Sequence, residues 1–195
     1  MFQVRMHGRG GQGVVTGARM LSIAAFLGGH CARALPSFGF ERTGAPVMAF
    51  CRIDDHPIRL REPVMAPDAL IIQDPTLLQQ VEFFSGLQRD GHVLINTGKS
   101  FGELELGQFA SGMRPERLLT VPATELAMQH VGRPLLNAAL LGAFAALGGL
   151  VTLQAVHAAI DRKFSGAVAA SNNVAPRAAF DVVRAEQKLA EDSHA

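Results

Sequence analysis

The sequence predicts an α/β domain: a doubly wound, mostly parallel sheet with an antiparallel hairpin at one edge and a helical C-terminal part. In the first two thirds of the chain, short apolar runs alternate with helical segments, as in a parallel sheet covered on both faces. After Pro122 the pattern is helical throughout. The chain has 195 residues and is 48% hydrophobic, which suits one domain. We place this domain at residues 1–190 and a frayed tail at 191–195.

Each expected element is an apolar or amphipathic segment bounded by turn residues. The expected strands are 2–7, 30–35, 47–54, 67–74, 91–96 and 117–122. Residues 58–60 are expected to fold back on 47–54 and form the edge hairpin. The expected helices are 14–27, 75–87, 123–131, 134–148, 152–164 and 174–190. The glycine-rich, polar segments 36–46 and 97–116 are expected to be connections.

Composition argues against several classes of function. A net charge of +1 and the absence of Trp and Tyr disfavour nucleic-acid binding. Two cysteines, Cys31 and Cys51, cannot by themselves form a four-ligand zinc or iron–sulfur site. The longest apolar stretch, 138–151, is shorter than the roughly 20 residues that span a bilayer, and the N-terminus does not resemble a signal peptide. We therefore expect a cytoplasmic chain that binds neither membrane nor metal.

The most informative motif is "GRGGQG" at residues 8–13, which follows an expected strand and opens an expected helix. In such a loop Gly8 allows the tight turn, Gly10 lets a ligand approach the backbone, and Gly13 lets the helix pack on the strand. The free amides of a helix N-terminus attract anions such as phosphate, and Arg9 can add a charged contact.

The second half of a dinucleotide-binding motif is missing. Such a site needs an acidic residue at the end of the second strand, where this chain reads "RALPSFGFE" and Glu41 falls too far along, inside a loop. Two interpretations remain open besides dinucleotide binding. The glycines serve strand–helix packing alone, or the loop holds an anionic ligand or a group of a partner, which is the interpretation we favour.

Other polar residues are expected at the same edge of the sheet, beyond the carboxyl ends of the strands. Asp74 precedes Pro75 and Thr76 and is interpreted mainly as a helix N-cap. Asn96 and Thr97 are either turn residues or part of a site. The segment 36–46 is expected to reach this edge too. The seven histidines are scattered, and no Ser in a G-x-S-x-G motif or placed pair of acids occurs, so the chain looks like part of an enzyme.

Five segments occur in an order that resembles one family. They are "GRGGQGVVTGARML", "PSFGFERTGAPVMAFCRI", "PDALIIQDPTLL", "GHVLINT" and "GRPLLNAALLGAFAAL". Over residues 3–182 the chain resembles the gamma subunit of the pyruvate/2-oxoacid:ferredoxin oxidoreductases. The resemblance implies a Rossmann-like domain without catalytic residues. It would work beside alpha, beta and delta-type subunits that hold thiamine diphosphate, Mg and [4Fe-4S] clusters.

In that family the complex decarboxylates a 2-oxoacid oxidatively, forms the acyl-coenzyme A and passes electrons to ferredoxin or another acceptor. The resemblance implies that this chain helps to close the active site around coenzyme A. The 2-oxoacid itself is not readable here, because its pocket is expected on other subunits. Candidate binding residues are Gly8, Arg9, Gly10, Gly11, Gln12, Gly13, Ser37, Glu41, Arg42, Asn96 and Asn137.

One departure from the family concerns Phe40 and Thr43, which stand where members often have proline and a basic residue. Phe40 either contacts a neighbouring subunit, which we favour, or enlarges a pocket for an aromatic 2-oxoacid. Two other functions are kept as alternatives: a free-standing dinucleotide-binding oxidoreductase, and a scaffold subunit that binds no small molecule.

Overall fold

A six-stranded mixed sheet forms the centre of the computed structural model, which describes residues 1–36, 43–133, 135–164, 166, 169–170 and 173–192. The strands are β1 (Phe2–Arg9), β2 (Cys31–Pro36), β3 (Pro46–Asp54), β4 (Ala69–Ile72), β5 (His92–Asn96) and β6 (Leu118–Val121). Their order in the sheet is β2-β3-β1-β4-β5-β6. β1, β4, β5 and β6 are parallel to one another, and β3 runs antiparallel to both of its neighbours. The prediction of a mostly parallel α/β sheet is confirmed.

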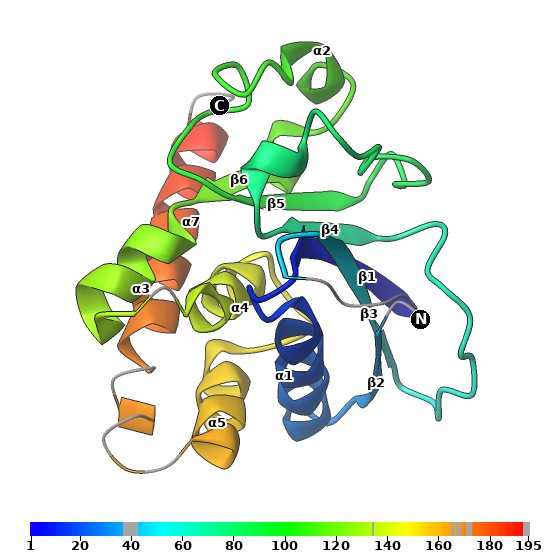
Figure 1. The fold of residues 1–195 in the computed structure, drawn as a ribbon, viewed down its shortest axis with the longest axis vertical. Coiled ribbons are helices and arrows are strands. Elements are labelled where there is room, and N and C mark those ends of the chain that lie inside the picture. The colour runs from blue at the N-terminus through cyan, green and yellow to red at the C-terminus, as the bar shows by residue number, and fades with distance from the viewer. Residues whose placement is uncertain (37–42, 134, 165, 167–168, 171–172, 193–195) are drawn as a thin grey trace.

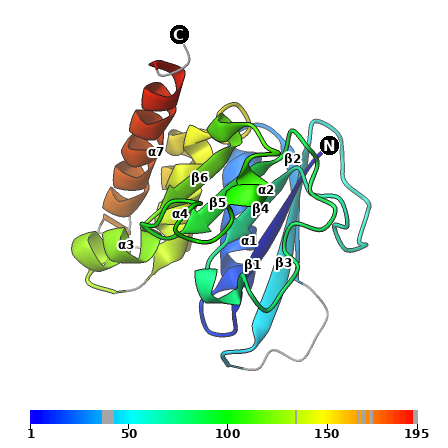
Figure 2. The same ribbon diagram turned by 90° about the horizontal axis from the view of Figure 1, so that it is seen from above.

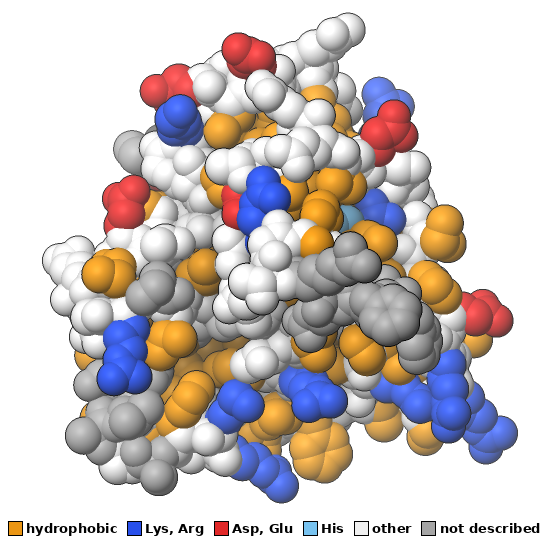
Figure 3. Space-filling view, in the orientation of Figure 1, with side chains coloured by type: hydrophobic (Ala, Val, Ile, Leu, Met, Phe, Trp, Pro, Cys, Tyr) orange, Lys and Arg blue, Asp and Glu red, His pale blue; other side chains and the backbone are white. Residues whose placement is uncertain are grey.

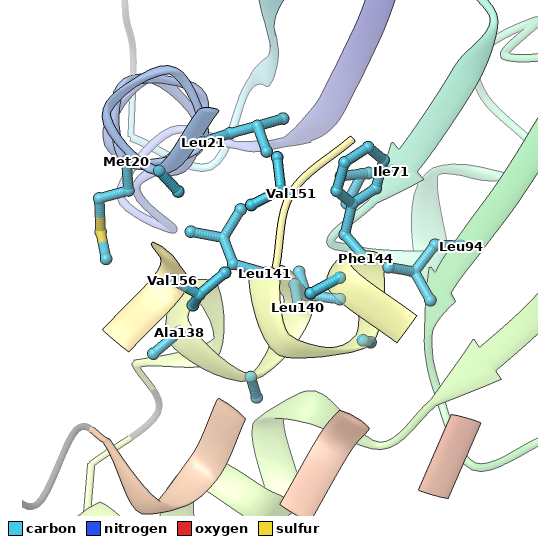
Figure 4. Packing of buried hydrophobic residues seen from close by; sticks show 14 of the residues in the cluster. Met20, Leu21, Ile71, Leu94, Ala138, Leu140, Leu141, Phe144, Val151 and Val156 are labelled. Atoms are coloured by element: carbon cyan, nitrogen blue, oxygen red, sulfur yellow. The ribbon is translucent and has the colours of Figure 1, made fainter. Parts of the chain in front are cut away.

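The long helices lie on one face of this sheet (Figures 1 and 2). They are α1 (Val14–Leu27), α3 (Ala123–Val131), α4 (Leu136–Ala146), α5 (Leu153–Lys163) and α7 (Val174–Asp192). α4 is buried around nearly its whole circumference, because it lies between the sheet and α7. Its residue Phe144 lies beside Ile71 and Leu94 of the sheet, whereas Leu141 lies on the side of Leu21 and Val156 (Figure 4). This contact explains the apolar stretch after residue 137 as a core helix.

Irregular segments cover the opposite face of β4, β5 and β6. Because side chains alternate along a strand, Ile72, Val93 and Ile95 point away from α4 and form a second core with Leu77 and Phe83. The expected helix at 75–87 is wrong: a single 3₁₀ turn, η1 (Pro75–Leu77), is followed by turns. The remaining short elements are η2 (Pro115–Arg117) and α2 (Gly107–Ala110), the latter inside the expected connection 97–116.

The antiparallel hairpin is present, but its strands differ from the predicted pair. Residues 58–60 form no strand, and β3 pairs instead with β2, the strand before it in the chain. The reason is geometric: β3 has β1 on one side and β2 on the other, so it offers no free edge. The helix expected at 174–190 is confirmed and extends to Asp192.

Candidate functional site

The turn at residues 8–13 lies at the carboxyl edge of the sheet, between β1 and α1. Gly13 is the N-cap of α1 in the left-handed conformation (φ 76°), which favours glycine, and no side chain caps the helix. The first amide to bond into the helix is that of Gly17, which donates to the carbonyl of Gly13 (2.8 Å). In the described part of the chain no acceptor meets the amides of Gly11, Gly13, Val14, Val15 and Thr16. This is the local arrangement that binds anions.

Gly10 has a different role from the expected one. It is buried, its amide donates to the carbonyl of Ala45 (2.8 Å), and its carbonyl accepts from the amide of Gly44 (3.0 Å). The pairing ties the turn to the segment that precedes β3, so residues 43–45 do reach this edge. The exposed glycine of the turn is Gly11, whose φ is 97°.

Arg9, Gln12 and Asp74 lock the turn to the end of β4. The Arg9 guanidinium Nε lies 3.1 Å from Asp74 Oδ2, and the Gln12 side-chain amide donates to the same oxygen (2.8 Å). The Gln12 carbonyl Oε1 accepts from the Arg9 backbone amide (2.7 Å). The other Arg9 nitrogens reach Thr76 Oγ1 (2.8 Å) and the Gly44 carbonyl (3.0 Å), so Arg9 is already engaged within the chain.

Asp74 also performs the predicted capping, because its Oδ1 accepts from the Thr76 amide (3.0 Å) at the start of η1. Burial raises the pKa of this carboxyl, but hydrogen bonds from Thr76 and Gln12 and the Arg9 charge outweigh burial and lower the pKa below its usual value. Asp74 is therefore a carboxylate at neutral pH. Its charge is compensated on the protein side.

Two side-chain amides fix the turn from behind. The Asn137 Nδ2 donates to the carbonyls of Gln12 (3.3 Å) and Gly13 (3.2 Å), and its Oδ1 accepts from Gln73 Nε2 (2.8 Å). Asn137 lies in the first turn of α4 and Gln73 directly after β4. The carboxyl edge of the sheet and the first turn of α4 thus set the shape of the glycine turn together.

Asn96, at the end of β5, serves as a brace as well. Its Nδ2 donates to the Gln73 carbonyl and to Thr124 Oγ1, both at 2.8 Å, and its Oδ1 accepts from the Thr124 amide (3.1 Å). These bonds tie β4, β5 and the first turn of α3 together. The sequence predicted Asn96 as either a turn residue or part of a site. In the structure it ends β5 and stabilises the edge of the site through these contacts.

A polar cavity of about 290 Å³ lies beside the turn, over the carboxyl ends of β4 and β5. It is lined by Gln12, Gln73, Asp74, Pro75, Asn96, Thr97, Gly98, Pro122, Thr124 and Glu125. Its walls include the carboxylates of Asp74 and Glu125, whereas the turn next to it presents backbone amides. The two halves of the site therefore differ in charge: the turn suits an anion, and the carboxylate of Glu125 suits a group that donates hydrogen bonds, since that of Asp74 is engaged within the chain.

The structure gathers Gly8–Gly13, Asn96 and Asn137 at this edge, while Ser37, Phe40, Glu41 and Arg42 lie outside the residues that it describes. Sequence reasoning missed Gln73, Thr76 and Thr124. A signal existed for Gln73, since it is a polar residue directly after an apolar strand. Across the described residues, no group of three His, Cys, Asp or Glu side chains could hold a metal ion. Nor is any helix in the described part long and apolar enough to cross a membrane.

Residues 3–182 match the family of pyruvate ferredoxin/flavodoxin oxidoreductases. The chain belongs to this family. It is 45% identical over 181 residues to the pyruvate/ketoisovalerate oxidoreductases common subunit gamma of Pyrococcus abyssi, covering 93% of this chain and 96% of that one. The predicted resemblance to the gamma subunits is thereby confirmed.

Solved structures of oxidoreductases of this kind have a similar fold. The crystal structure of pyruvate oxidoreductase subunit PORC from Thermotoga maritima has a TM-score of 0.77 and 35% identity, over 92% of this chain and 95% of that one. A structure of 2-oxoglutarate:ferredoxin oxidoreductase from Magnetococcus marinus, with 2-oxoglutarate, coenzyme A and succinyl-CoA bound, has a TM-score of 0.68. The match covers 96% of this chain and 31% of that longer chain at 18% identity, so this likeness concerns the fold alone.

Proposed function

We propose that this chain is the gamma subunit of a cytoplasmic 2-oxoacid:acceptor oxidoreductase and that its glycine turn holds a phosphate of coenzyme A. The observation that carries the proposal is the uncapped start of α1, where the amides of Gly11 and of Gly13–Thr16 have no acceptor among the described residues. A phosphate oxygen satisfies such amides and is favoured by the helix dipole. The family membership supplies the reaction in which this ligand takes part.

The resemblance to the gamma subunits implies how the roles are divided in the proposed complex. Alpha, beta and delta-type subunits would carry thiamine diphosphate, Mg and [4Fe-4S] clusters, which supply the decarboxylation and the electron path to ferredoxin or another acceptor. This chain would hold and orient coenzyme A. The Arg9–Asp74–Gln12 lock keeps the turn in shape, since its charges are paired with one another. The acceptor-rich cavity over β4 and β5 would take an N–H or O–H group of the same ligand.

The topology disfavours the alternative of a free-standing dinucleotide-binding enzyme. In such a site the strand that follows α1 lies next to β1 and ends on the acidic residue that binds the ribose. Here β3, an antiparallel strand, lies next to β1, and β2 is one place further away. β2 ends at Pro36, which carries no carboxylate. Up to Pro36, the last residue described after β2, a ribose lying on the turn would find no acidic partner on this strand.

Thr16→Asp in the assembled complex tests the proposal. Thr16 lies in the first turn of α1, where a carboxylate stabilises the helix but occupies and repels an anion site. We expect the KM for coenzyme A to rise about tenfold or more while the melting temperature stays equal or increases. Ser22→Asp, which adds the same charge further along α1, is the matched control and should leave the KM unchanged.

Three outcomes separate the alternatives. An unchanged KM for coenzyme A in an intact Thr16→Asp complex would overturn the phosphate proposal and favour a scaffold role. A purified chain that is active alone and binds a nicotinamide or flavin nucleotide would favour the dinucleotide enzyme. Co-purification of subunits containing thiamine diphosphate and iron supports the gamma-subunit role.

A further inference from the structure

The segment 55–66, which joins β3 to β4, has neither helix nor strand and is largely exposed. In Figure 1 it is the long cyan to green connection on the side of the sheet away from α1 and α4. Loops of this length without secondary structure are uncommon inside a compact domain and usually have a function. The carboxyl-edge site uses no residue of this segment.

Three arginines of the sheet hold this segment through its backbone carbonyls. Arg33 of β2 donates to the Ile58 carbonyl (3.2 Å), and Arg52 of β3 donates to the Pro63 carbonyl (3.4 Å). Arg5 of β1 donates to the Val64 carbonyl (3.4 Å). The segment thus crosses β2, β3 and β1 in their order in the sheet. Its shape is fixed by side chains rather than by a backbone ladder.

Two of these arginines are buried, which is costly for a charged group unless it is paired. Arg5 is 7% exposed and Arg52 is 3% exposed, and neither makes an ion pair with a residue that the structure describes. The Arg52 Nη1 is buried and has no hydrogen-bond partner among those residues. The charge of Glu62, a residue of the segment, acts on Arg52, and the carbonyls of Val64, Phe83 and Ser85 accept hydrogen bonds from Arg5.

The outer surface of the segment combines apolar and basic side chains. Met65 is 76% exposed and Leu60 is 44% exposed, both unusually high for large apolar residues. Arg59 and Arg61 flank Leu60 and are exposed, and the exposed acids of the segment are Glu62, next to Arg61, and Asp55 at its start. Figure 3 shows Lys and Arg side chains grouped along the lower right edge of the molecule, where the segment lies in Figure 1.

We propose that segment 55–66 is the docking surface for another subunit of the same complex, one that presents an apolar centre with an acidic rim. The proposal rests on the proposed function, because it takes the complex as given. Charge complementarity selects the partner, because Arg59 and Arg61 are exposed on the surface of the segment and favour acidic side chains. A second copy of this chain would set the same positive charges against each other.

The test is co-expression of the chain with the other subunits, followed by native mass spectrometry of the assembled complex. Leu60→Asp with Met65→Asp places two negative charges in the apolar centre. Arg59→Glu with Arg61→Glu reverses the rim. We expect each pair to lower the assembled fraction about tenfold or more, because a desolvated centre and its charges dominate binding. Circular dichroism of each isolated variant should show an unchanged melting temperature, since all four side chains are exposed.

Met128→Asp is the matched control, because Met128 is an exposed apolar residue of α3 (49%), on the helical side of the sheet. It should leave assembly unchanged. A photo-crosslinking amino acid at position 60 should join this chain to an apolar surface of another subunit that acidic residues surround, and one at position 128 should not. High salt should weaken assembly of the wild type more than that of the rim variant.

The failures of the two proposals are distinguishable. A wild-type chain that recruits no other subunit contradicts the proposed function. A wild type that assembles, together with folded variants at positions 60 and 65 that assemble equally well, contradicts the docking surface alone. Dimers of the isolated chain that crosslink through position 60 would show that a second copy occupies this surface, and would overturn the inference.

Discussion

The side-chain amides of Gln73 and Asn137 are joined by a hydrogen bond of 2.8 Å, although 64 positions separate the two residues in the chain. The Asn137 side-chain amide also donates to the backbone carbonyls of Gln12 and Gly13. The carbonyls of Gln12 and Gly13 are therefore satisfied from within the protein. The amides of Gly11 and Gly13–Thr16 have no acceptor among the described residues, so the pair of side-chain amides is a positioning device for the proposed phosphate site.

Asn137→Asp should loosen the turn. The new carboxylate still accepts from Gln73 but cannot donate to the two carbonyls, which then lie buried against a negative charge. We expect the free energy of unfolding to fall by about 2 kcal/mol and the KM for coenzyme A to rise. Urea titration followed by circular dichroism measures the first quantity, because the chain has no Trp or Tyr for fluorescence. Gln80→Glu, the same chemical change at an exposed position, should have little effect on either.

Asp74→Asn should destabilise the chain near neutral pH and less so in acid. The pKa of Asp74 is lower in the folded chain than in the unfolded one, so its contribution to stability is complete above the unfolded value of about 4 and is lost as the pH falls through the folded value. We expect a loss of about 2 kcal/mol above pH 5, as for hydrogen bonds to a charged group. The difference should shrink below pH 4. A difference that is constant from pH 7 to pH 3 would contradict this assignment.

Local sequence signals predicted a large part of this structure. The six strands follow from apolar runs, the start of α1 follows from the glycine spacing, and the Asp74 cap follows from its neighbours Pro75 and Thr76. Each of these depends on residues that are close together in the chain. The family resemblance added Asn137 to the candidates, but the sequence did not show that this residue acts through backbone carbonyls.

What the sequence did not predict depends on contacts between distant segments. The placement of β3 beside β1 decides which strands form the edge hairpin, and no local pattern encodes it. The apolar residues of 75–87 resemble those of a helix. In the fold, however, Arg5 binds the carbonyls of Phe83 and Ser85, and Gly86 turns back against residue 65 in a left-handed conformation. The hydrogen bonds from the buried Arg5 and the close contact at Gly86 therefore stabilise turns in this segment, although its apolar residues are spaced as in a helix.

Gly142→Ala should strongly destabilise the chain. Gly142 lies where α4 packs against α7, and a Cβ atom there would collide with the backbone carbonyl of Pro176. Because a backbone group cannot rotate away as a side chain can, the two helices would have to separate. We expect a loss of about 3 kcal/mol in the free energy of unfolding. Gly107→Ala, where a Cβ atom meets nothing, should be nearly neutral, and equal melting temperatures for the two variants would contradict the close packing.

His7 should make the folded chain sensitive to mild acid. Burial, reinforced by the charge of Arg5, lowers the pKa of His7 to about 3, and burial also lowers that of His92, to about 4. The unfolded chain binds the His7 proton near pH 6.5 and the folded chain does not until about pH 3. The unfolded state therefore holds more protons between these values, and stability falls as the pH is lowered through this window.

His7→Gln should reduce this sensitivity, because glutamine offers an acceptor to Arg5 and does not titrate. The variant should be less stable at pH 8, where it loses the packing of the His7 ring against Phe83. Between pH 6 and pH 4 its free energy of unfolding should approach that of the wild type by about 1.4 kcal/mol per pH unit, the effect of one proton. Urea titrations at half-unit steps measure the slope. His56→Gln, at an exposed histidine, should reproduce the wild-type slope, and an equal slope for His7→Gln would show that His7 is not the group that titrates.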